Sequence, residues 1–227
     1  MYGLSPEVIE QVRERQGRLH PFDALQGKRS ALVVVDMQNY FVKPGFQAEV
    51  PAARDIAPAI NRAARSMRAY GGTVVWVQTA SDGADVAWSW LHRHLYTAQR
   101  SRRRLEELAQ GSEGFALWGE LQPLPQDLRI TKTRFSAFIQ GSSDLERQLR
   151  ARGVDTVLVA GTATNICCSC TAQDAMMLDF RTAMLADANA APTPPLHLEA
   201  LKNFILFFGD VMNVDEMEAL LAAGAGP

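Results

Sequence analysis

Apolar runs and helical periodicities alternate along this chain. Four mostly apolar runs, at 31–35, 73–78, 155–160 and 181–186, predict strands that are buried on both faces. Shorter strands are expected near 129–131 and at 210–213. Between the strands, apolar residues at helical spacing predict helices at 56–67, near 145–149, at 168–179, at 196–208 and at 214–222. This alternation predicts an α/β fold, a Rossmann-like three-layer α/β/α sandwich with a mainly parallel sheet of about six strands.

The segment before the first strand differs from the rest of the chain. Residues 1–29 are polar and Arg-rich, with a helical stretch near 6–17, and we interpret them as an N-terminal extension that packs on a neighbouring subunit. Residues 30–227 carry the strand and helix pattern without an internal repeat or a linker. A length of 227 residues fits one α/β domain, so we expect residues 30–227 to form a single domain.

Composition and charge exclude several classes of protein. Hydrophobic residues make up 47% and charged residues 21%, which excludes a disordered, collagen-like or coiled-coil protein. A net charge of −2 gives no basic footprint for nucleic acid, and no apolar run approaches a membrane span. The basic cluster of Arg100 with Arg102–Arg104 precedes two glutamates and is interpreted as a solvated helix face. The three cysteines lie within four positions and form no disulfide framework, so a reduced, cytoplasmic protein is expected.

Candidate chemistry follows the predicted strands. In a parallel sheet, ligands bind beyond the carboxyl ends of the strands, where this chain has Asp36, Lys132 and Cys167. Taken singly, these are typical of a helix cap, a solvated cation and a small buried side chain. Together they indicate a nucleophilic thiol at Cys167 with a cation, Lys132, and a base, Asp36, because a thiol is activated by a nearby cation, a base or a helix N-terminus.

Three segments carry a resemblance to a known family. They are VVVDMQNYF (33–41), ITKTRFSAF (130–138) and LVAGTATNICCSCTAQDA (158–175), and they resemble the isochorismatase-like cysteine hydrolase superfamily from about residue 30 onwards. The resemblance implies a catalytic Asp36 and Lys132 and a nucleophilic Cys167. It also implies a cis peptide at Thr162–Ala163 and an oxyanion hole formed by the backbone N–H groups of Ala163 and Cys167.

The residues also indicate a branch of that superfamily. True isochorismatases lack the nucleophilic cysteine, and its nicotinamidases carry a metal set with several histidines after the second strand. This chain has four histidines, His20, His92, His94 and His197, and none lies in 79–85, so neither a metal nor another cofactor is expected. The sequence is most similar to the enzymes that act on N-carbamoylsarcosine, ureidoacrylate, biuret or maleamate. The resemblance therefore implies a homodimeric or homotetrameric cysteine amidohydrolase that cleaves a C–N bond of a small carbamoyl or amide substrate through a thioester and releases ammonia.

Candidate substrate-binding residues lie near the same sheet edge. They are Phe41, Gln78, Trp88, Arg134, Phe135, Phe138 and Thr162. The aromatic residues among them could equally belong to the core, and Arg134 could bind a substrate carboxylate or form a surface ion pair. The amides of Gln38, Asn39, Gln78 and Gln140 are further candidates to bind a planar urea or amide group.

Two other functions remain open at this point. Cys167 and Cys170 form a C-x-x-C at a helix start, which is typical of a thiol redox protein. A non-catalytic, small-molecule-binding Rossmann-like protein is the other alternative, although the turn Gly161-Thr162-Ala163 matches no dinucleotide or phosphate motif. Structural zinc would need a fourth ligand beside the three cysteines.

Overall fold

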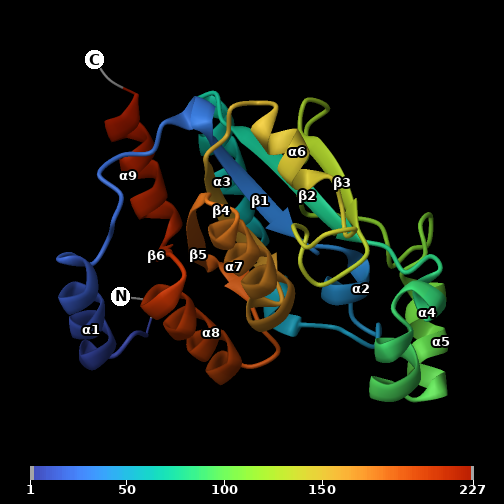
Figure 1. The fold of residues 1–227 in the computed structure, drawn as a ribbon. Coiled ribbons are helices and arrows are strands. Elements are labelled where there is room, and N and C mark those ends of the chain that lie inside the picture. The colour runs from blue at the N-terminus through green and yellow to red at the C-terminus, as the bar shows by residue number, and fades with distance from the viewer. Residues whose placement is uncertain (1–2, 226–227) are drawn as a thin grey trace.

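A six-stranded, entirely parallel sheet forms the centre of the molecule, in the order β3-β2-β1-β4-β5-β6 (Figure 1). The structure is a computed structural model, and it describes residues 3–225. The strands are β1 (Ser30–Val35), β2 (Thr73–Thr79), β3 (Leu128–Lys132), β4 (Thr156–Thr162), β5 (Arg181–Ala190) and β6 (Asp210–Met212). The predicted α/β/α class and parallel sheet are confirmed.

The helices connect these strands and cover both faces of the sheet. The longer ones are α1 (Pro6–Gln16), α3 (Ala57–Ala69), α5 (Ala98–Glu107), α6 (Leu145–Arg150), α7 (Ser169–Met177), α8 (Pro194–Phe207) and α9 (Val214–Gly224). Two four-residue helices, α2 (Asn39–Val42) and α4 (Ala84–Ala87), follow β1 and β2. Short 3-10 helices span Gly27–Arg29 and Pro51–Ala53, and wider π-type turns span Leu91–Leu95 and Thr164–Cys168.

The two faces of the sheet belong to separate hydrophobic clusters. Strand β1 shows why, because its residues alternate between the faces and all of them are buried. Leu32 and Val34 contribute to the cluster beneath α3 and α9, whereas Ala31, Val33 and Val35 contribute to the cluster that includes α6, α7 and α8. A strand covered on both sides is a continuous apolar run, which is the pattern of 31–35.

The segment before β1 packs against the domain of its own chain. Helix α1 lies along α8, on the outside of the sandwich (Figure 1). Val8 and Val12 are buried in the same cluster as α8, and the Arg15 guanidinium donates to the Ile205 carbonyl at 3.1 Å. The helix expected near 6–17 is therefore present, and within this chain it contacts α8.

Candidate functional site

The first site residue, Asp36, directly follows β1 and is completely buried. Its backbone N–H donates to the Val77 carbonyl at 2.9 Å, so β1 and β2 are still paired at this point. Its φ is 54°, in the left-handed region that aspartate tolerates better than most residues. A left-handed non-glycine residue held in place by the surrounding sheet is typical of a functional position.

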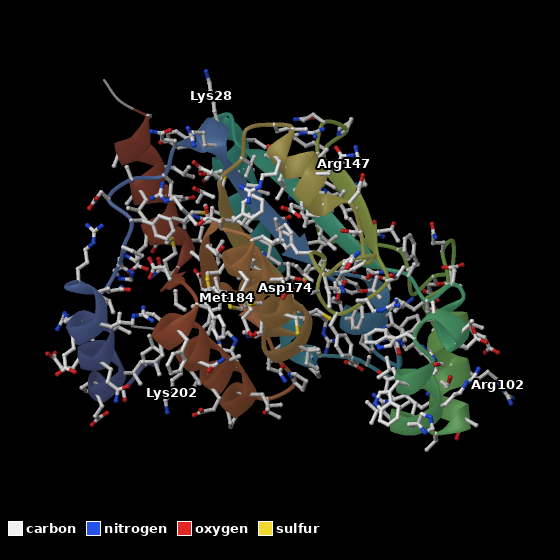
Figure 2. All side chains as sticks on the ribbon, in the orientation of Figure 1. Lys28, Arg102, Arg147, Asp174, Met184 and Lys202 are labelled. Atoms are coloured by element: carbon white, nitrogen blue, oxygen red, sulfur yellow. The ribbon has the colours of Figure 1, made fainter. Side chains whose placement is uncertain are left out.

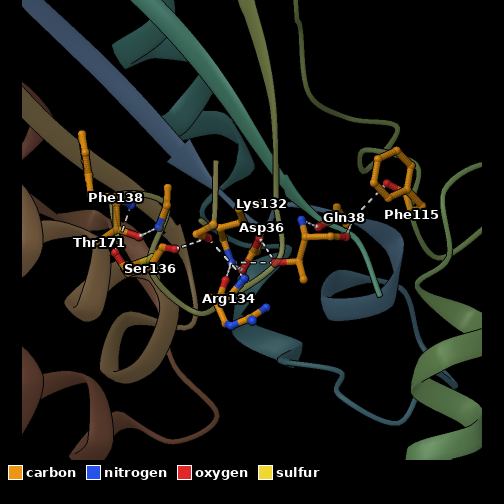
Figure 3. Close-up of polar contacts among 12 residues, drawn as sticks. Asp36, Gln38, Phe115, Lys132, Arg134, Ser136, Phe138 and Thr171 are labelled. Carbon is orange, nitrogen blue, oxygen red and sulfur yellow. Dashed lines mark hydrogen bonds and ion pairs between the residues drawn. The ribbon is translucent and has the colours of Figure 1, made fainter. Parts of the chain in front are cut away.

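Lys132, the last residue of β3, points its ammonium at Asp36 (Figure 3). It is fully buried and donates to Asp36 Oδ2 at 2.9 Å, to Thr79 Oγ1 at 2.6 Å and to the Arg134 carbonyl at 3.0 Å. These contacts occupy the three donors of a lysine ammonium. The structure thus brings two of the three predicted catalytic residues into a buried ion pair.

Thr79 completes this pair, and it was not among the predicted site residues. Its hydroxyl donates to Asp36 Oδ1 at 2.8 Å while it accepts from Lys132, so it touches both members of the ion pair. Thr79 lies directly opposite Lys132 in the β2–β3 register. A polar residue at the end of the buried strand that adjoins the lysine strand is the sequence signal that would have identified it.

Gln38 has a structural role that differs from its expected one. Its side-chain amide donates to the carbonyls of Thr79 and Phe115, both at 3.0 Å (Figure 3), and its Oε1 accepts from the Thr79 N–H at 2.7 Å. The amide is completely buried and has partners at both ends, so Gln38 holds the end of β2 rather than presenting a group to a urea. The Asn39 amide likewise donates to the Glu113 carbonyl, and that of Gln78 donates to the Phe115 carbonyl.

The turn that carries Cys167 is shaped by close backbone approach. At Gly161, which has a φ of 118°, a Cβ atom would lie 2.1 Å from the Val35 carbonyl oxygen, so only glycine fits beside β1. The peptide bond that follows Thr162, Thr162–Ala163, is cis. The chain then enters a π-type turn over Thr164–Cys168 that leads into α7, so the helical segment starts earlier than the predicted residue 168.

Within that turn the Ala163 carbonyl organises the amides around Cys167. It accepts from the N–H of Ile166 at 3.0 Å and from that of Cys168 at 3.2 Å. Cys167 lies between these two donors, and its side chain is 6% exposed. It lies inside the first turn of the helical segment rather than just before the helix as predicted, and at this end of a helix the peptide dipoles favour negative charge.

Burial raises the pKa of the Cys167 thiol, and the Asp36 carboxylate raises it further, whereas the Lys132 ammonium lowers it. Burial by itself lowers the pKa of Lys132, but Asp36 and Cys167 together raise it above its ordinary value. Lys132 is therefore charged at neutral pH, and the thiol keeps its proton. Desolvation therefore outweighs the nearby cation, and the thiol needs a base to remove its proton when it reacts.

A second cation near the site corrects another expectation. Arg104, on α5, is 5% exposed, although the sequence indicated a solvated face for the whole basic cluster. Its charge lowers the pKa of both Cys167 and Lys132. Arg102 of the same helix is exposed, and Figure 2 shows it pointing away from the domain, whereas Arg103 is partly buried and donates to Glu107 Oε1 at 2.8 Å. Arg104 faces inward because its turn of α5 is held against the segment after β2, where the Arg104 carbonyl accepts from the Ser81 hydroxyl at 3.0 Å.

Some of the predicted substrate-binding residues gather at a surface depression of about 400 Å³ beside α7. The rings of Trp88 and Phe135 pack edge to face there, with centroids 4.7 Å apart. Arg134 and Cys170 line the same depression. The guanidinium of Arg134 donates to the carbonyls of Ala87 and Thr133 and lies over the Trp88 ring. Within residues 3–225 no carboxylate lies within 4.0 Å of it, so the surface ion pair considered for Arg134 is not formed.

The other predicted substrate-binding residues do not line this depression. Phe138 is buried against Phe180, with ring centroids 5.5 Å apart, so it belongs to the core. Phe41 packs edge to face on Tyr40, with a centroid distance of 4.9 Å. Thr162 is buried and its hydroxyl donates to the Ala190 carbonyl at 3.2 Å.

The histidines are dispersed over the molecule. His20 contacts Asp210, His92 contacts Ser101 and His197 contacts Thr164, each through one ring nitrogen. Over the part of the chain that the structure describes, no group of three or more His, Cys, Asp or Glu side chains could hold a metal ion. The three cysteines are free thiols. None of the helices found between residues 3 and 225 has the length and apolar character needed to cross a bilayer.

Comparison with known proteins gives consistent matches over most of the chain. The family model described as the isochorismatase domain matches residues 30–216. The ureidoacrylate amidohydrolase RutB of Methylorubrum extorquens is 34% identical over 214 residues, which cover 88% of this chain and 86% of that protein. A cysteine hydrolase structure from Pseudomonas syringae pv. phaseolicola superposes with a TM-score of 0.79 at 28% identity, covering 88% and 96% of the two chains. The N-carbamoylsarcosine amidase structure from Thermoplasma acidophilum superposes with a TM-score of 0.64 at 27% identity, covering 82% and 97%.

Proposed function

The chain belongs to the isochorismatase family, and we propose that it is a cysteine amidohydrolase that cleaves a C–N bond of a small carbamoyl or amide substrate. The observation that carries the proposal is the buried Asp36–Lys132 ion pair beside the Cys167 thiol. A relative named ureidoacrylate amidohydrolase and a structural neighbour named N-carbamoylsarcosine amidase support the substrate class.

In the proposed first step, Asp36 acts as the general base. Because burial keeps the Cys167 thiol protonated, the proton moves to the Asp36 carboxylate only as the sulfur attacks the substrate carbonyl carbon. The new S–C bond pushes the carbonyl electrons onto oxygen. Lys132 stays charged and offsets the negative charge that passes from the carboxylate to the sulfur and then to the substrate. Thr79, which touches both members of the pair, keeps the carboxylate oriented towards the thiol.

The developing oxyanion would accept hydrogen bonds from the backbone N–H groups of Ala163 and Cys167. Donors that are held in place before the reaction stabilise such charge without reorganising, and in many enzymes this stabilisation contributes more to the rate than any other effect. Ala163 directly precedes the π-type turn over Thr164–Cys168, and Cys167 lies within that turn, so the two amides belong to neighbouring parts of one backbone segment.

In the second half of the reaction, protonated Asp36 returns its proton to the leaving nitrogen, the C–N bond breaks and ammonia departs. A thioester between Cys167 and the substrate acyl or carbamoyl group remains. Water then gives a proton to Asp36 and adds its oxygen to the thioester carbon, and the C–S bond breaks as the sulfur recovers a proton. The enzyme returns to its starting state, and the net reaction consumes one water.

The test measures ammonia release from a panel of ureidoacrylate, N-carbamoyl amino acids, biuret, maleamate and nicotinamide. We expect release by the wild type and none by Cys167→Ser, and the substrate with the highest kcat/KM would identify the substrate class. Cys168→Ala serves as a matched control, because Cys168 is a buried neighbour with no role in the scheme. Normal turnover by Cys167→Ser, or silence of the wild type across the panel, would overturn the proposal.

A further inference from the structure

Arg104 carries a positive charge inside the protein without a carboxylate beside it. Its side chain is 5% exposed, and its Nε has no hydrogen-bond partner. Among the ion pairs formed within residues 3–225, none with atoms closer than 4.0 Å includes Arg104. An ionised group that is buried without an opposite charge is costly. A protein that keeps such a group in this state has a use for an anion at that position.

The position of Arg104 is beside the candidate active site. The Arg104 carbonyl accepts from the Ser81 hydroxyl at 3.0 Å, and Ser81 follows Thr79 by two residues, so this turn of α5 is fixed to the end of β2. The guanidinium carbon lies 5.9 Å from the ring centroid of Tyr40, which follows Asp36 on α2. The charge is also close enough to lower the pKa of the Cys167 thiol.

The neighbouring groups leave this charge uncompensated. Glu107, one turn further along α5, accepts from Arg103 Nε at 2.8 Å through one carboxylate oxygen. Its other oxygen is buried without a hydrogen-bond partner, and no ion pair within 4.0 Å joins Glu107 to Arg104 in the described part of the chain. Burial and the charge of Arg104 both lower the pKa of His92, so its ring is neutral at pH 7 and adds no charge. Asp36 is already paired with Lys132. The site therefore holds one cation more than its own carboxylate can balance.

Resting on the proposed function, we propose that Arg104 binds the carboxylate of the substrate, which makes the substrates ureido or amido acids. Such a molecule carries its scissile carbamoyl or amide group at one end and a carboxylate at the other. The planar guanidinium matches the two oxygens of a carboxylate and gains strength in a site that excludes water. The substrate charge then supplies the anion that the folded chain lacks at Arg104.

Arg134, which the sequence indicated as a candidate to bind a substrate carboxylate, is less suited to that role. Its guanidinium already donates to the Ala87 carbonyl at 2.7 Å and to the Thr133 carbonyl at 3.0 Å. It also lies over the Trp88 ring, with its central carbon 5.3 Å from the centroid. These contacts hold Arg134 in the wall of the depression, whereas Arg104 has an unpartnered donor.

The test compares an anionic with a neutral ureide of similar length, ureidoacrylate and allylurea. For each, kcat/KM is measured with the wild type, Arg104→Gln, Arg104→Lys, Arg134→Gln and the exposed control Arg102→Gln. We expect the ureidoacrylate-to-allylurea ratio to fall about 100-fold in Arg104→Gln, mainly through KM, because a charge-assisted bidentate contact is lost. Arg104→Lys keeps the charge without the planar fork and should fall about tenfold. The ratio should not change in Arg102→Gln.

A binding measurement separates this inference from the hydrolase proposal. Calorimetric titration of both ureides into Cys167→Ser, with and without Arg104→Gln, needs no turnover, and circular dichroism verifies that each variant is folded. If the wild type releases no ammonia but Arg104→Gln weakens ureidoacrylate binding alone, the carboxylate site stands and the hydrolase proposal fails. The inference on Arg104 is overturned if ureidoacrylate does not bind, or binds equally well without Arg104. It is also overturned if both ureides lose equal kcat/KM, or if only Arg134→Gln changes the ratio.

Discussion

Strand β3 has a buried ion pair at each of its ends, and the two pairs differ in what surrounds them. Before its first residue, Asp127 accepts from Arg68 Nε at 2.9 Å, from Trp76 Nε1 at 2.8 Å and from the Leu124 N–H at 2.8 Å. At its last residue, Lys132 donates to Asp36, Thr79 and a carbonyl. The groups around the Asp127–Arg68 pair are not reactive. The second lies beside a protonated thiol and an unbalanced arginine.

The difference follows from the polarity of a parallel sheet. All strands end at the edge where Asp36, Lys132 and the Cys167 turn meet, so side chains from four strands converge there. At the opposite edge the strands begin, and the loops that arrive from the helices only need to be fixed. A satisfied carboxylate therefore stabilises the fold at one end of β3, whereas reactive groups are assembled at the other.

The largest expected effect is a difference in activity between variants of Asp36 and Asp127, the carboxylates at the two ends of β3. Asp36→Asn should lower kcat/KM by about 10²–10⁴, because it removes the general base of the proposed mechanism. Asp127→Asn, at the other end of β3, should stay within about threefold of the wild type because Asp127 contacts no reacting atom. Ammonia-release kinetics measure both. Equal losses in the two variants would mean that the ends of β3 do not differ in function.

At the start of β3, Asp127 should contribute to the stability of the fold rather than to activity. Burial alone would raise the pKa of Asp127, but its donors, Arg68 foremost, together lower it below the ordinary value. The carboxylate therefore contributes stability above the unfolded pKa of about 4, and this contribution is lost as the pH falls through the lower folded pKa.

Asp127→Asn should accordingly lower the free energy of unfolding by about 1–3 kcal/mol at pH 7, and by less near pH 3. Urea denaturation at the two pH values measures this difference. Asp144→Asn, in the exposed pair with Arg147, is the control and should change stability by no more than about 0.5 kcal/mol. A loss for Asp127→Asn that does not depend on pH would contradict the assigned ion pair.

A smaller effect should follow from removing the hydroxyl that joins Asp36 to Lys132. Thr79→Val keeps the shape of the side chain but leaves one oxygen of Asp36 and one donor of Lys132 without their partner. We expect kcat/KM to fall about tenfold, the effect of one charge-assisted hydrogen bond. Thr131→Val, at an exposed position of β3 next to Lys132, is the matched control and should retain full activity. Full activity of Thr79→Val would show that Asp36 is positioned without it.

The smallest expected effect concerns the reactivity of the thiol without substrate. Because the Asp36 charge raises the pKa of Cys167 and the Lys132 charge lowers it, their removal should act in opposite directions. At pH 8, iodoacetamide should alkylate Cys167 about three to ten times faster in Asp36→Asn than in the wild type, and more slowly in Lys132→Gln. Mass spectrometry distinguishes Cys167 from Cys168 and Cys170. A change in the same direction in both variants would contradict the electrostatic assignment.

The sequence allowed accurate prediction where local pattern and final environment agree. The runs at 31–35 and 73–78 became β1 and β2 because strands covered on both faces must be continuously apolar. Local pattern failed where packing decided the outcome. Phe138 and Phe135 lie three residues apart in one loop, yet the first packs in the core against Phe180 and the second lines a depression with Trp88.

By itself, then, the sequence determined the order of strands and helices and the residue types at the strand ends, because hydrophobic periodicity and motif spacing are local properties. Only the tertiary structure decided which polar groups are buried together. It showed that Thr79 joins Asp36 and Lys132, that Gln38 holds β2, and that burial raises the pKa of the Cys167 thiol. It also separated the buried Arg104 from the exposed Arg102. Burial and charge pairing depend on neighbours that are distant in the chain, and no local pattern encodes them.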